Sequence, residues 1–541
     1  MSNPRRDESA PDKESVPERS QGLKENSEQE TPTLARADGV QEFGSAEQTP
    51  EATTQPSPKS DKIDRIGTVS LGKLIVEFAI PSIIGMVVNG SYNIISTVFL
   101  GLSLGASGLA TVTVATPIMT MSLAMSLLVG AGGNALAAIK LGEGKRDTAE
   151  RVMGSAFVLS ICLALLSTLL TFLFMDPILM ISGSTEGIQD STRVFVGIIA
   201  VGFVFQYLGM AFNSFMRTAG NPRGALYVMI VGMGTSIALN YLFVMVNGWG
   251  VVGSGWATVI GMMVTTVGGL GYFVKSKTTP FRLRRRHILK PSSRLMVNIC
   301  VLGSASFFLQ AAAVVINLIL NNQLVFYGAL DPIGAEGALA TVGVMSRIAM
   351  FAIFPILGVS IAIQPILGFN YGAKLYARVK KTFAISTVWV LAFGVLFWLL
   401  VHIFPVQIVG LFGVADGLSD FTVEAIQVMM LLMPFVGVQV LAAGYFQATD
   451  QPIKSMFVSM TRQLIFLIPL LLLLPLVVEQ VVGGITPLQS LYYTYPIADV
   501  LSILTALVMM FFEWKRLGRM QKKQHDKTLE PSSAVNQAAV S

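Results

Sequence analysis

The sequence predicts an all-α polytopic membrane protein with twelve transmembrane helices in two parallel six-helix repeats. Three observations predict it: few charges, long apolar stretches at regular intervals, and a similarity between the two halves. Of 541 residues, 52% are hydrophobic and 13% are charged, whereas soluble proteins carry about 25% charged residues. With a mean hydropathy of +0.63, this composition excludes an ordinary soluble enzyme. The two cysteines exclude a disulfide-stapled secreted domain.

Residues 1–65 differ from the rest of the chain. They hold 9 basic and 14 acidic residues, are rich in Ser, Pro, Gln and Thr, and show no apolar periodicity. Such a segment cannot bury enough apolar surface to offset its ordering entropy. Residues 1–65 are therefore predicted to be a disordered cytoplasmic tail, and they contain no apolar core of a signal peptide.

Twelve apolar stretches follow, each long enough for the roughly 20 residues that cross a bilayer as a helix. They predict an N-terminal six-helix lobe at 66–276, a basic cytoplasmic linker at 277–294, a C-terminal six-helix lobe at 295–514 and a cytoplasmic tail at 515–541. The predicted spans are Leu71–Leu100, Ser107–Leu136, Gly154–Phe174, Val194–Phe215, Ala225–Val246, Gly250–Phe273, Leu295–Leu320, Ala338–Leu367, Phe383–Phe404, Val423–Ala443, Phe457–Val478 and Leu491–Phe512.

Basic residues gather in alternate loops, and acidic residues gather in the loops between them. This is the positive-inside pattern of membrane proteins, and it predicts a multi-pass membrane protein with both termini in the cytoplasm. The net charge of +6 then reflects topology, and we expect no nucleic-acid partner. The basic loops carry Lys140, Lys145, Arg146 and Arg151; Arg217 and Arg223; Arg282, Arg284, Arg285, Arg286 and Lys290; Lys374, Arg378, Lys380 and Lys381; Lys454; and Lys515, Arg516, Arg519, Lys522 and Lys523.

The two halves resemble one another at a spacing of about 230 residues, the mark of an internal repeat. Val98–Gly101 matches Val325–Gly328 at an offset of 227, and Pro222 matches Pro452 at an offset of 230. Because six helices separate the matches, both repeats have the same orientation in the membrane. Parallel repeats predict a site between two lobes that rock around it.

Motifs for other functions are absent from the sequence. It has no P-loop for ATP, no His/Cys cluster with metal-ligand spacing, no hydrolase motif, and no repeated filter loop of an ion channel. We therefore expect a transporter and not an enzyme, driven by a proton or sodium gradient without another cofactor. Its expected partners are a small-molecule substrate and the lipid bilayer, and we expect a monomer.

Asp499 is the acidic residue nearest the middle of a predicted span. An ionisable group in hydrocarbon is costly, so it marks a functional site by default. It shares a helix face with Tyr495 and Ser502, at spacings of 4 and 3 residues. We predict Asp499 to be the ion-coupling residue; the alternative is a structural carboxylate paired with Arg347 in the eighth span.

Neutral polar side chains follow one face of several other spans. They are candidates to line a water-filled substrate cavity, although polar side chains also hold helices together in membranes. The 26 methionines offer a surface that adapts to varied ligands. The predicted cavity residues are Asn93, Ser96, Gln206, Asn213, Gln310, Asn317 and Tyr495.

The segment Gln364–Lys374 reads Gln-Pro-Ile-Leu-Gly-Phe-Asn-Tyr-Gly-Ala-Lys and is followed by Arg378-Val379. It resembles the Q-P-x-x-G-x-N-Y-G-A-x signature of the multidrug and toxic compound extrusion (MATE) family of secondary transporters. Arg217-x-x-Gly220-Asn221-Pro222 and Pro496–Asp499 fit the same family. The resemblance covers about residues 70–515. It implies a V-shaped fold of two six-helix lobes that exports organic cations and other toxic compounds in exchange for protons or sodium.

One position departs from that resemblance. Many relatives carry an Asp after Tyr-Asn-x-x in the first helix, where it serves ion coupling, and here that position is Ser96. Coupling is then expected to rest on Asp499 in the other lobe or on neutral oxygen ligands. A further alternative is that this member moves something other than the usual cations.

The resemblance thus implies export of drugs or toxic organic compounds, expected to be cationic, by ion-coupled antiport with alternating access in a bacterial inner (plasma) membrane. One alternative is a lipid-linked saccharide flippase, which needs a cationic cavity for pyrophosphate. The spans offer only Arg347 and, near an edge, Arg217 for that purpose. Another alternative is a non-transporting receptor or scaffold that acts through the N-terminal tail.

Overall fold

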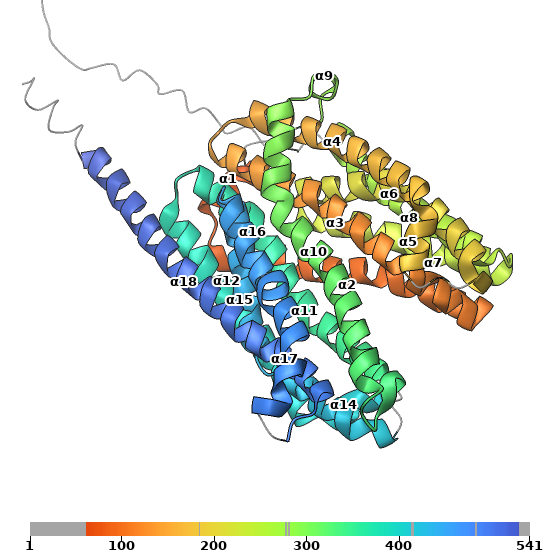
Figure 1. Cartoon of the computed structure of the whole chain (residues 1–541). Coiled ribbons are helices and arrows are strands. Elements are labelled where there is room, and N and C mark those ends of the chain that lie inside the picture. Colours follow the sequence, from red (N-terminus) through yellow and green to blue (C-terminus); the bar gives the residue numbers. More distant parts are fainter. Residues whose placement is uncertain are drawn as a thin grey trace, which may run out of the picture. The chain divides into compact units, whose positions relative to one another are not determined.

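A computed structural model describes residues 61–529, except 183, 185, 276–278, 280–281, 413–415 and 482–483. The described residues belong to one compact unit, and every regular element among them is a helix (Figure 1). The predicted disorder of residues 1–60 lies outside the described part. Residues 61–65 instead begin a helix, α1 (Asp61–Thr68).

Long helices make up most of the described chain, and a few short helices connect some of them (Figure 1). The first group comprises α2 (Leu71–Leu104), α3 (Ala106–Gly142), α4 (Arg146–Leu173), α5 (Met175–Ile181), α6 (Glu186–Thr218), α7 (Pro222–Asn240), the π-helix η1 (Tyr241–Val246) and α8 (Gly250–Lys275). The second comprises α9 (Arg285–Leu289), α10 (Ser293–Gly328), α11 (Gly334–Gly372), α12 (Tyr376–Ile403), α13 (Pro405–Gly410), α14 (Asp416–Met429), α15 (Met433–Ala448), α16 (Pro452–Met460), the π-helix η2 (Thr461–Leu467), α17 (Ile468–Val481) and α18 (Pro487–Leu529).

Eleven helical segments of the described part are long and apolar enough to cross a membrane, and the bent pair α14 and α15 makes a twelfth. This confirms the predicted fold class. The tenth predicted span, Val423–Ala443, falls on this pair, in which the two helices are bent by 45° relative to each other. Pro434 lies in the first turn of α15, where it cannot continue a helix from the preceding residues because it lacks an N–H and disfavours helical conformation before it. The last helix runs on to Leu529, beyond residue 514.

The turns after equivalent helices share one backbone conformation in both halves. Gly144 and its repeat counterpart Lys374 have φ of 76° and 59°, and Gly220 and its counterpart Asp450 have φ of 76° and 58°. Glycine is the usual residue at positive φ. Lys374 and Asp450 adopt the same turn without a glycine, so the sequence of the second half does not indicate these turns. Each turn closes with the same backbone hydrogen bond. These bonds run from Lys145 N to Lys140 O, Leu375 N to Asn370 O, Asn221 N to Met216 O and Gln451 N to Phe446 O, at 2.8 to 3.0 Å.

The two groups of helices meet where α3 and α11 end. A Cβ atom added to Gly142 would lie 2.0 Å from the carbonyl oxygen of Phe369, and one added to Gly372 would lie 2.2 Å from that of Ile139. Phe369 is the repeat counterpart of Ile139, as Gly372 is of Gly142, so the two contacts are related by the repeat. Only glycine allows the backbones to approach this closely, as in other packed membrane helices.

The close approach continues along both helices. A Cβ at Gly303 of α10 would lie 1.8 Å from the carbonyl oxygen of Leu128 in α3, and a Cβ at Gly358 of α11 would lie 2.6 Å from Cα of Ile83 in α2. Leu128 and Gly358 each lie about four turns before the end of their helix, which corresponds to about 21 Å of helix. The halves are therefore in backbone contact over the part nearest the basic loops, here named the basic end.

A hydrogen bond between repeat-related side chains crosses the same contact. The amide nitrogen of Asn134 donates to Oε1 of Gln364 at 3.2 Å, and both side chains are buried. The N-terminal segment is also tied to the second half, because Nη2 of Arg378 donates to the carbonyl oxygens of Ile66 (3.1 Å) and Val69 (2.8 Å). These bonds hold the basic end closed in the described conformation.

We predict that Gly142→Ala or Gly372→Ala opens the basic end, because the added methyl group has no space. Overpacking costs about 1–3 kcal/mol, enough to shift two populations roughly 5- to 150-fold. Distances between spin labels on Lys145→Cys and Lys374→Cys, in a chain without Cys162 and Cys300, measure the opening. Gly343→Ala is the matched control in α11, since nothing lies within 4 Å of its added Cβ. Identical distance distributions for all three variants would contradict the prediction.

Candidate functional site

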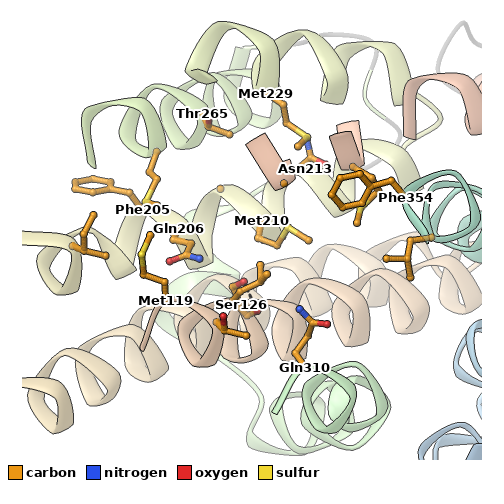
Figure 2. A pocket seen from close by; sticks show the side chains of 18 of the residues that line it. Met119, Ser126, Phe205, Gln206, Met210, Asn213, Met229, Thr265, Gln310 and Phe354 are labelled. Carbon is orange, nitrogen blue, oxygen red and sulfur yellow. Dashed lines mark hydrogen bonds between the residues drawn. The ribbon is translucent and has the colours of Figure 1, made fainter. Parts of the chain in front are cut away.

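A cavity of about 310 Å³ lies between the two groups of helices (Figure 2). It is lined by residues of α2, α3, α6, α7 and α8 from the first group and of α10 and α11 from the second. Ser126 and Leu357 line it and are near neighbours in sequence of Leu128 and Gly358. The cavity therefore begins where the glycine contact ends, on the side away from the basic end.

The described lining contains no charged side chain. Thioether and aromatic groups give it a polarizable and adaptable apolar surface, supplied by Met86, Met119, Met210, Met229, Met262, Met350, Phe205 and Phe354. A few neutral polar groups are placed among them, as is typical of small-molecule pockets. These are Thr120, Ser126, Gln206, Asn213, Thr265 and Gln310.

Three of the predicted cavity residues come together in this site. Gln206 and Asn213 of α6 face the cavity opposite Gln310 of α10 (Figure 2). The Ser122 hydroxyl donates to Oε1 of Gln206 at 2.8 Å, which fixes the orientation of that amide. Asn213 donates to the carbonyl oxygen of Ala225 at 2.9 Å, so its amide nitrogen is already bonded to the protein.

The other predicted cavity residues lie elsewhere or outside the description. Ser96 is buried, and its hydroxyl lies 3.1 Å from that of Thr258 in α8. Asn317 is exposed on α10, and Tyr495 is partly buried against an apolar cluster of the second half that includes Ile316 and Leu471. The side chain of Asn93 is outside the described residues. None of these four is part of the described lining, so their role in a substrate route stays a prediction.

Asp499 is 2% exposed and forms an ion pair within the second half. Nε of Arg462, in the π-helix η2, donates to Oδ1 of Asp499 at 2.5 Å. The alternative interpretation named Arg347 as the partner, and that pairing is wrong: the Arg347 side chain is exposed on α11, whereas η2 packs directly against α18. Sequence spacing could not identify Arg462, because the two partners are 37 positions apart and the chain reverses direction between them.

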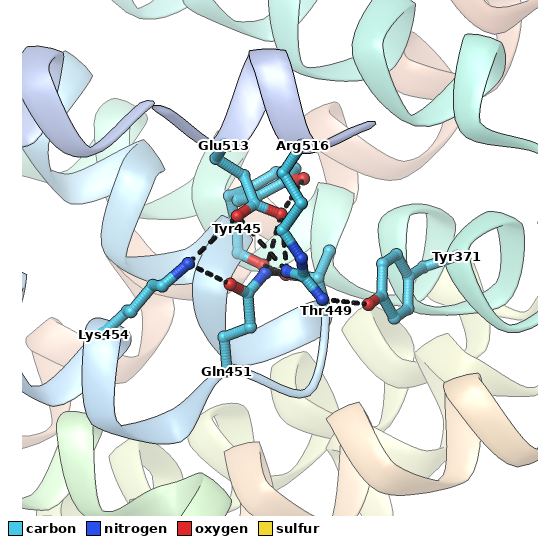
Figure 3. A network of polar contacts seen from close by, with 7 residues as sticks. All are labelled: Tyr371, Tyr445, Thr449, Gln451, Lys454, Glu513 and Arg516. Atoms are coloured by element: carbon cyan, nitrogen blue, oxygen red, sulfur yellow. Dashed lines mark hydrogen bonds and ion pairs between the residues drawn. The ribbon is translucent and has the colours of Figure 1, made fainter. Parts of the chain in front are cut away.

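A second buried carboxylate, Glu513, was not identified from the sequence because it stands at the end of the last predicted span. It accepts hydrogen bonds from Lys454 (3.1 Å), Arg516 (3.0 Å) and Gln451 (2.9 Å) (Figure 3). Tyr445 also donates to it, at 3.5 Å. Two cations and two neutral donors satisfy this carboxylate fully, so it joins α15, α16 and α18 at the basic end.

The structure corrects the placement of Arg217, which we assigned to a cytoplasmic loop. It lies in the last turn of α6 and is only 8% exposed, whereas Arg223 of the same predicted loop is exposed. Helix α6 runs past the predicted span end at Phe215 to Thr218, and this places the Arg217 side chain among helices. Among the described residues, no group of three or more His, Cys, Asp or Glu side chains could hold a metal ion.

The chain is similar to known proteins over most of its length. The family model "MatE" matches residues 81–242 and 307–473, more than half of the chain. The multidrug export protein MepA of Staphylococcus aureus (strain MSSA476) is 22% identical over 449 residues, which covers 82% of this chain and 94% of that protein.

Solved structures share the fold. The crystal structure of MATE in the bent conformation superposes with a TM-score of 0.76 at 21% identity, covering 85% of this chain and 98% of that one. The MATE multidrug transporter DinF-BH in complex with R6G superposes with a TM-score of 0.73 at 29% identity, covering 82% and 96%. The two-lobed architecture is thus that of these transporters.

We predict that thiol labelling from water distinguishes the cavity from its surroundings. In a chain without Cys162 and Cys300, cysteines at Gln206→Cys and Gln310→Cys should react with a polar maleimide, because water reaches the cavity and allows thiolate to form. Ser96→Cys is the matched buried control and should react at least tenfold more slowly. Equal labelling rates at the three positions, measured by mass spectrometry, would contradict this geometry.

Proposed function

This chain belongs to the MatE family, and on that premise we propose that it is a secondary active efflux transporter of drugs or toxic organic compounds. The observation that carries the proposal is the uncharged, methionine-lined cavity between the two groups of helices. A site of this kind binds by apolar area and shape, with a few hydrogen bonds for orientation. That chemistry suits varied organic compounds, and it agrees with the multidrug export of the relative MepA.

We propose alternating access as its mechanism. The basic end is closed by glycine contacts while the cavity lies beyond them. If the basic loops are cytoplasmic, as the positive-inside pattern predicts, the described conformation is the outward-facing one. Export then requires the contact between α3 and α11 to open, so that substrate enters from the cytoplasm or inner leaflet. Substrate and coupling ion must bind the two conformations unequally, because equal binding shifts no equilibrium.

Asp499 is the proposed coupling residue, with a proton or sodium ion as the coupling ion. Either ion would compete with Arg462 for the carboxylate and so weaken the pair between η2 and α18. Both partners are placed where the helical ladder is irregular: Arg462 is in a π-helix, and Pro496 interrupts α18 one turn before Asp499. Such positions are where helices bend, so loss of the pair can be converted into a movement of the second lobe.

The proposal also concerns the charge of the substrate. We expected organic cations, and the neighbour DinF-BH was solved in complex with R6G. The described lining offers no carboxylate to attract a cation, so we propose selection by apolar surface, with any charge preference to be measured. The flippase alternative is disfavoured by the same neutral lining, which offers no cation for a pyrophosphate within the cavity. The receptor alternative predicts that deletion of residues 1–60 abolishes function while transport persists.

We predict ion-driven transport in proteoliposomes. A dye such as R6G should move against its gradient when a proton or sodium gradient is imposed, and the variant Gln206→Ala should bind it about 2- to 10-fold more weakly through loss of one hydrogen bond. Gln489→Ala, remote from the cavity, is the control. Failure of a panel of cationic, neutral and anionic dyes to respond to either gradient would contradict the proposed function.

We predict that Asp499→Asn abolishes gradient-driven efflux without abolishing dye binding, because Asn cannot exchange a proton or hold a sodium ion by charge. The change leaves the partly buried Arg462 without its partner, and loss of one member of an ion pair in a low-dielectric site is destabilising. The double variant Asp499→Asn/Arg462→Gln removes both charges and separates folding from coupling. Glu424→Gln, an exposed acid, is the control that should transport normally. Unchanged efflux by the double variant would remove Asp499 from the mechanism.

A further inference from the structure

Arg217 carries a buried positive charge that no described acidic residue balances. Its Nη1 donates to Oδ1 of Asn213, and its Nη2 donates to the Ser214 hydroxyl at 3.1 Å. Both acceptors are neutral. Its Nε has no hydrogen-bond partner in the described protein, and no ion pair there involves Arg217. A buried charge without a counter-charge is costly, and the C-terminal end of helix α6 offsets only part of that cost.

The repeat shows that the fold itself does not need a charge at this position. Gln447 is the repeat counterpart of Arg217 and stands at the same distance before the equivalent turn. It is also buried, and it satisfies its amide by donating to the carbonyl oxygen of Leu302 at 2.8 Å. A neutral side chain therefore packs at this place in the second half. The arginine of the first half has a surplus charge, which points to a ligand.

A small pocket of about 20 Å³ lies beside Arg217. Ser82 lines it from α2, is 5% exposed, and has a hydroxyl without a hydrogen-bond partner in the described protein. An arginine N–H can only donate, and a serine hydroxyl can donate as well. Two unpartnered donors, one of them charged, thus border a space that suits a single small group. Acceptors with negative charge form the strongest hydrogen bonds with such donors.

The pocket is the closed end of the larger cavity. Met86, Met210, Asn213 and Met229 line both of them. The larger cavity has no charged residue in its described lining, whereas Arg217 lines the small pocket that adjoins it. An anionic group of a compound bound in the larger cavity would reach the guanidinium by passing these four shared side chains.

We propose that Arg217 and Ser82 form an anion-binding site at the closed end of the cavity, which takes one monovalent group: a carboxylate of the transported compound or a free halide ion. The carboxylate case rests on the proposed function, since it assigns amphipathic carboxylates to the substrates of the same cavity. The halide case does not depend on transport. In both cases the anion neutralises Arg217 and stabilises the conformation in which the pocket exists.

The test is anion-dependent thermal stability of the purified full-length protein in nanodiscs. At matched ionic strength, the melting temperature should be higher in chloride than in gluconate, which is too large for the pocket. The increase should saturate as the chloride concentration rises. Decanoate should raise it more than methyl decanoate, which has the same chain without the charge. Stabilisation by chloride alone identifies a free halide site, stabilisation by decanoate alone identifies a substrate carboxylate site, and either supports the proposal.

Variants assign the effect to the pocket. Arg217→Gln, which copies the neutral residue of the second half, should abolish both responses, and Ser82→Ala should weaken the apparent affinity about 2- to 10-fold, as expected for one hydrogen bond. Arg223→Gln is the control, because this arginine is exposed beyond the end of α6 and should leave both responses intact. Equal stabilisation of the parent chain and Arg217→Gln, or none in the parent chain, would overturn the proposal.

A second measurement covers the case in which Arg217→Gln does not fold. Crystals of the parent chain grown in bromide should show an anomalous peak beside Nε of Arg217, and its absence with ordered bromide elsewhere would overturn the halide site. The carboxylate site can be tested in the parent chain alone, by comparing the melting temperature in decanoate with that in methyl decanoate. Transport of a neutral dye by the parent chain in proteoliposomes needs no anion at Arg217, so a failed anion site and a failed transport function give different results.

Discussion

The backbone contact between α3 and α11 is the constraint on which the rest of the structure depends. In a bilayer, helices gain little from hiding apolar surface, and packing at small residues holds them together. Here Gly142 and Gly372 each meet a carbonyl of the opposite helix, and the repeat relates the two contacts. The contact fixes the axis between the halves, closes the basic end, and determines that the cavity lies beyond it. An interface made of backbone has two states, packed or separated, which is what an alternating-access protein needs.

Charge is distributed unequally between the two halves. The second half contains two buried carboxylates that are balanced locally, Asp499 by Arg462 and Glu513 by Lys454 and Arg516. The described part of the first half has one buried carboxylate, Glu150, which is paired with Arg284, and a buried arginine, Arg217, without a described counter-charge. A buried charge is retained in a membrane protein when it is paired or when it serves a ligand. We therefore propose that the ion response lies in the second half, whereas substrate contacts both halves around the neutral cavity between them.

The overall architecture could be predicted from the sequence, and much of the site could not. Span length, loop charge and the repeat offset follow from the bilayer, and they predicted the fold class correctly. Pro434 marks the break between α14 and α15 in the sequence. Ser96 and Asn317 were assigned to the cavity because helix periodicity gives a face without saying which neighbour covers it. Ser96 turns to Thr258, and Asn317 is exposed on α10. Arg462 and the burial of Arg217 depend on tertiary packing, which no local pattern encodes.

The most direct test of the account is to lock the contact and measure transport. A Cβ at Gly368 would lie 2.8 Å from that of Ala138, and the Cβ atoms of a disulfide lie about 3.8 Å apart. A disulfide between cysteines at these positions therefore needs the two helices to separate by about 1 Å, and it then holds the basic end nearly closed. In a chain otherwise free of cysteine, we expect oxidation to stop gradient-driven efflux and reduction to restore it. Undiminished efflux by a chain shown to be fully crosslinked would mean that the lobes need not separate at the basic end.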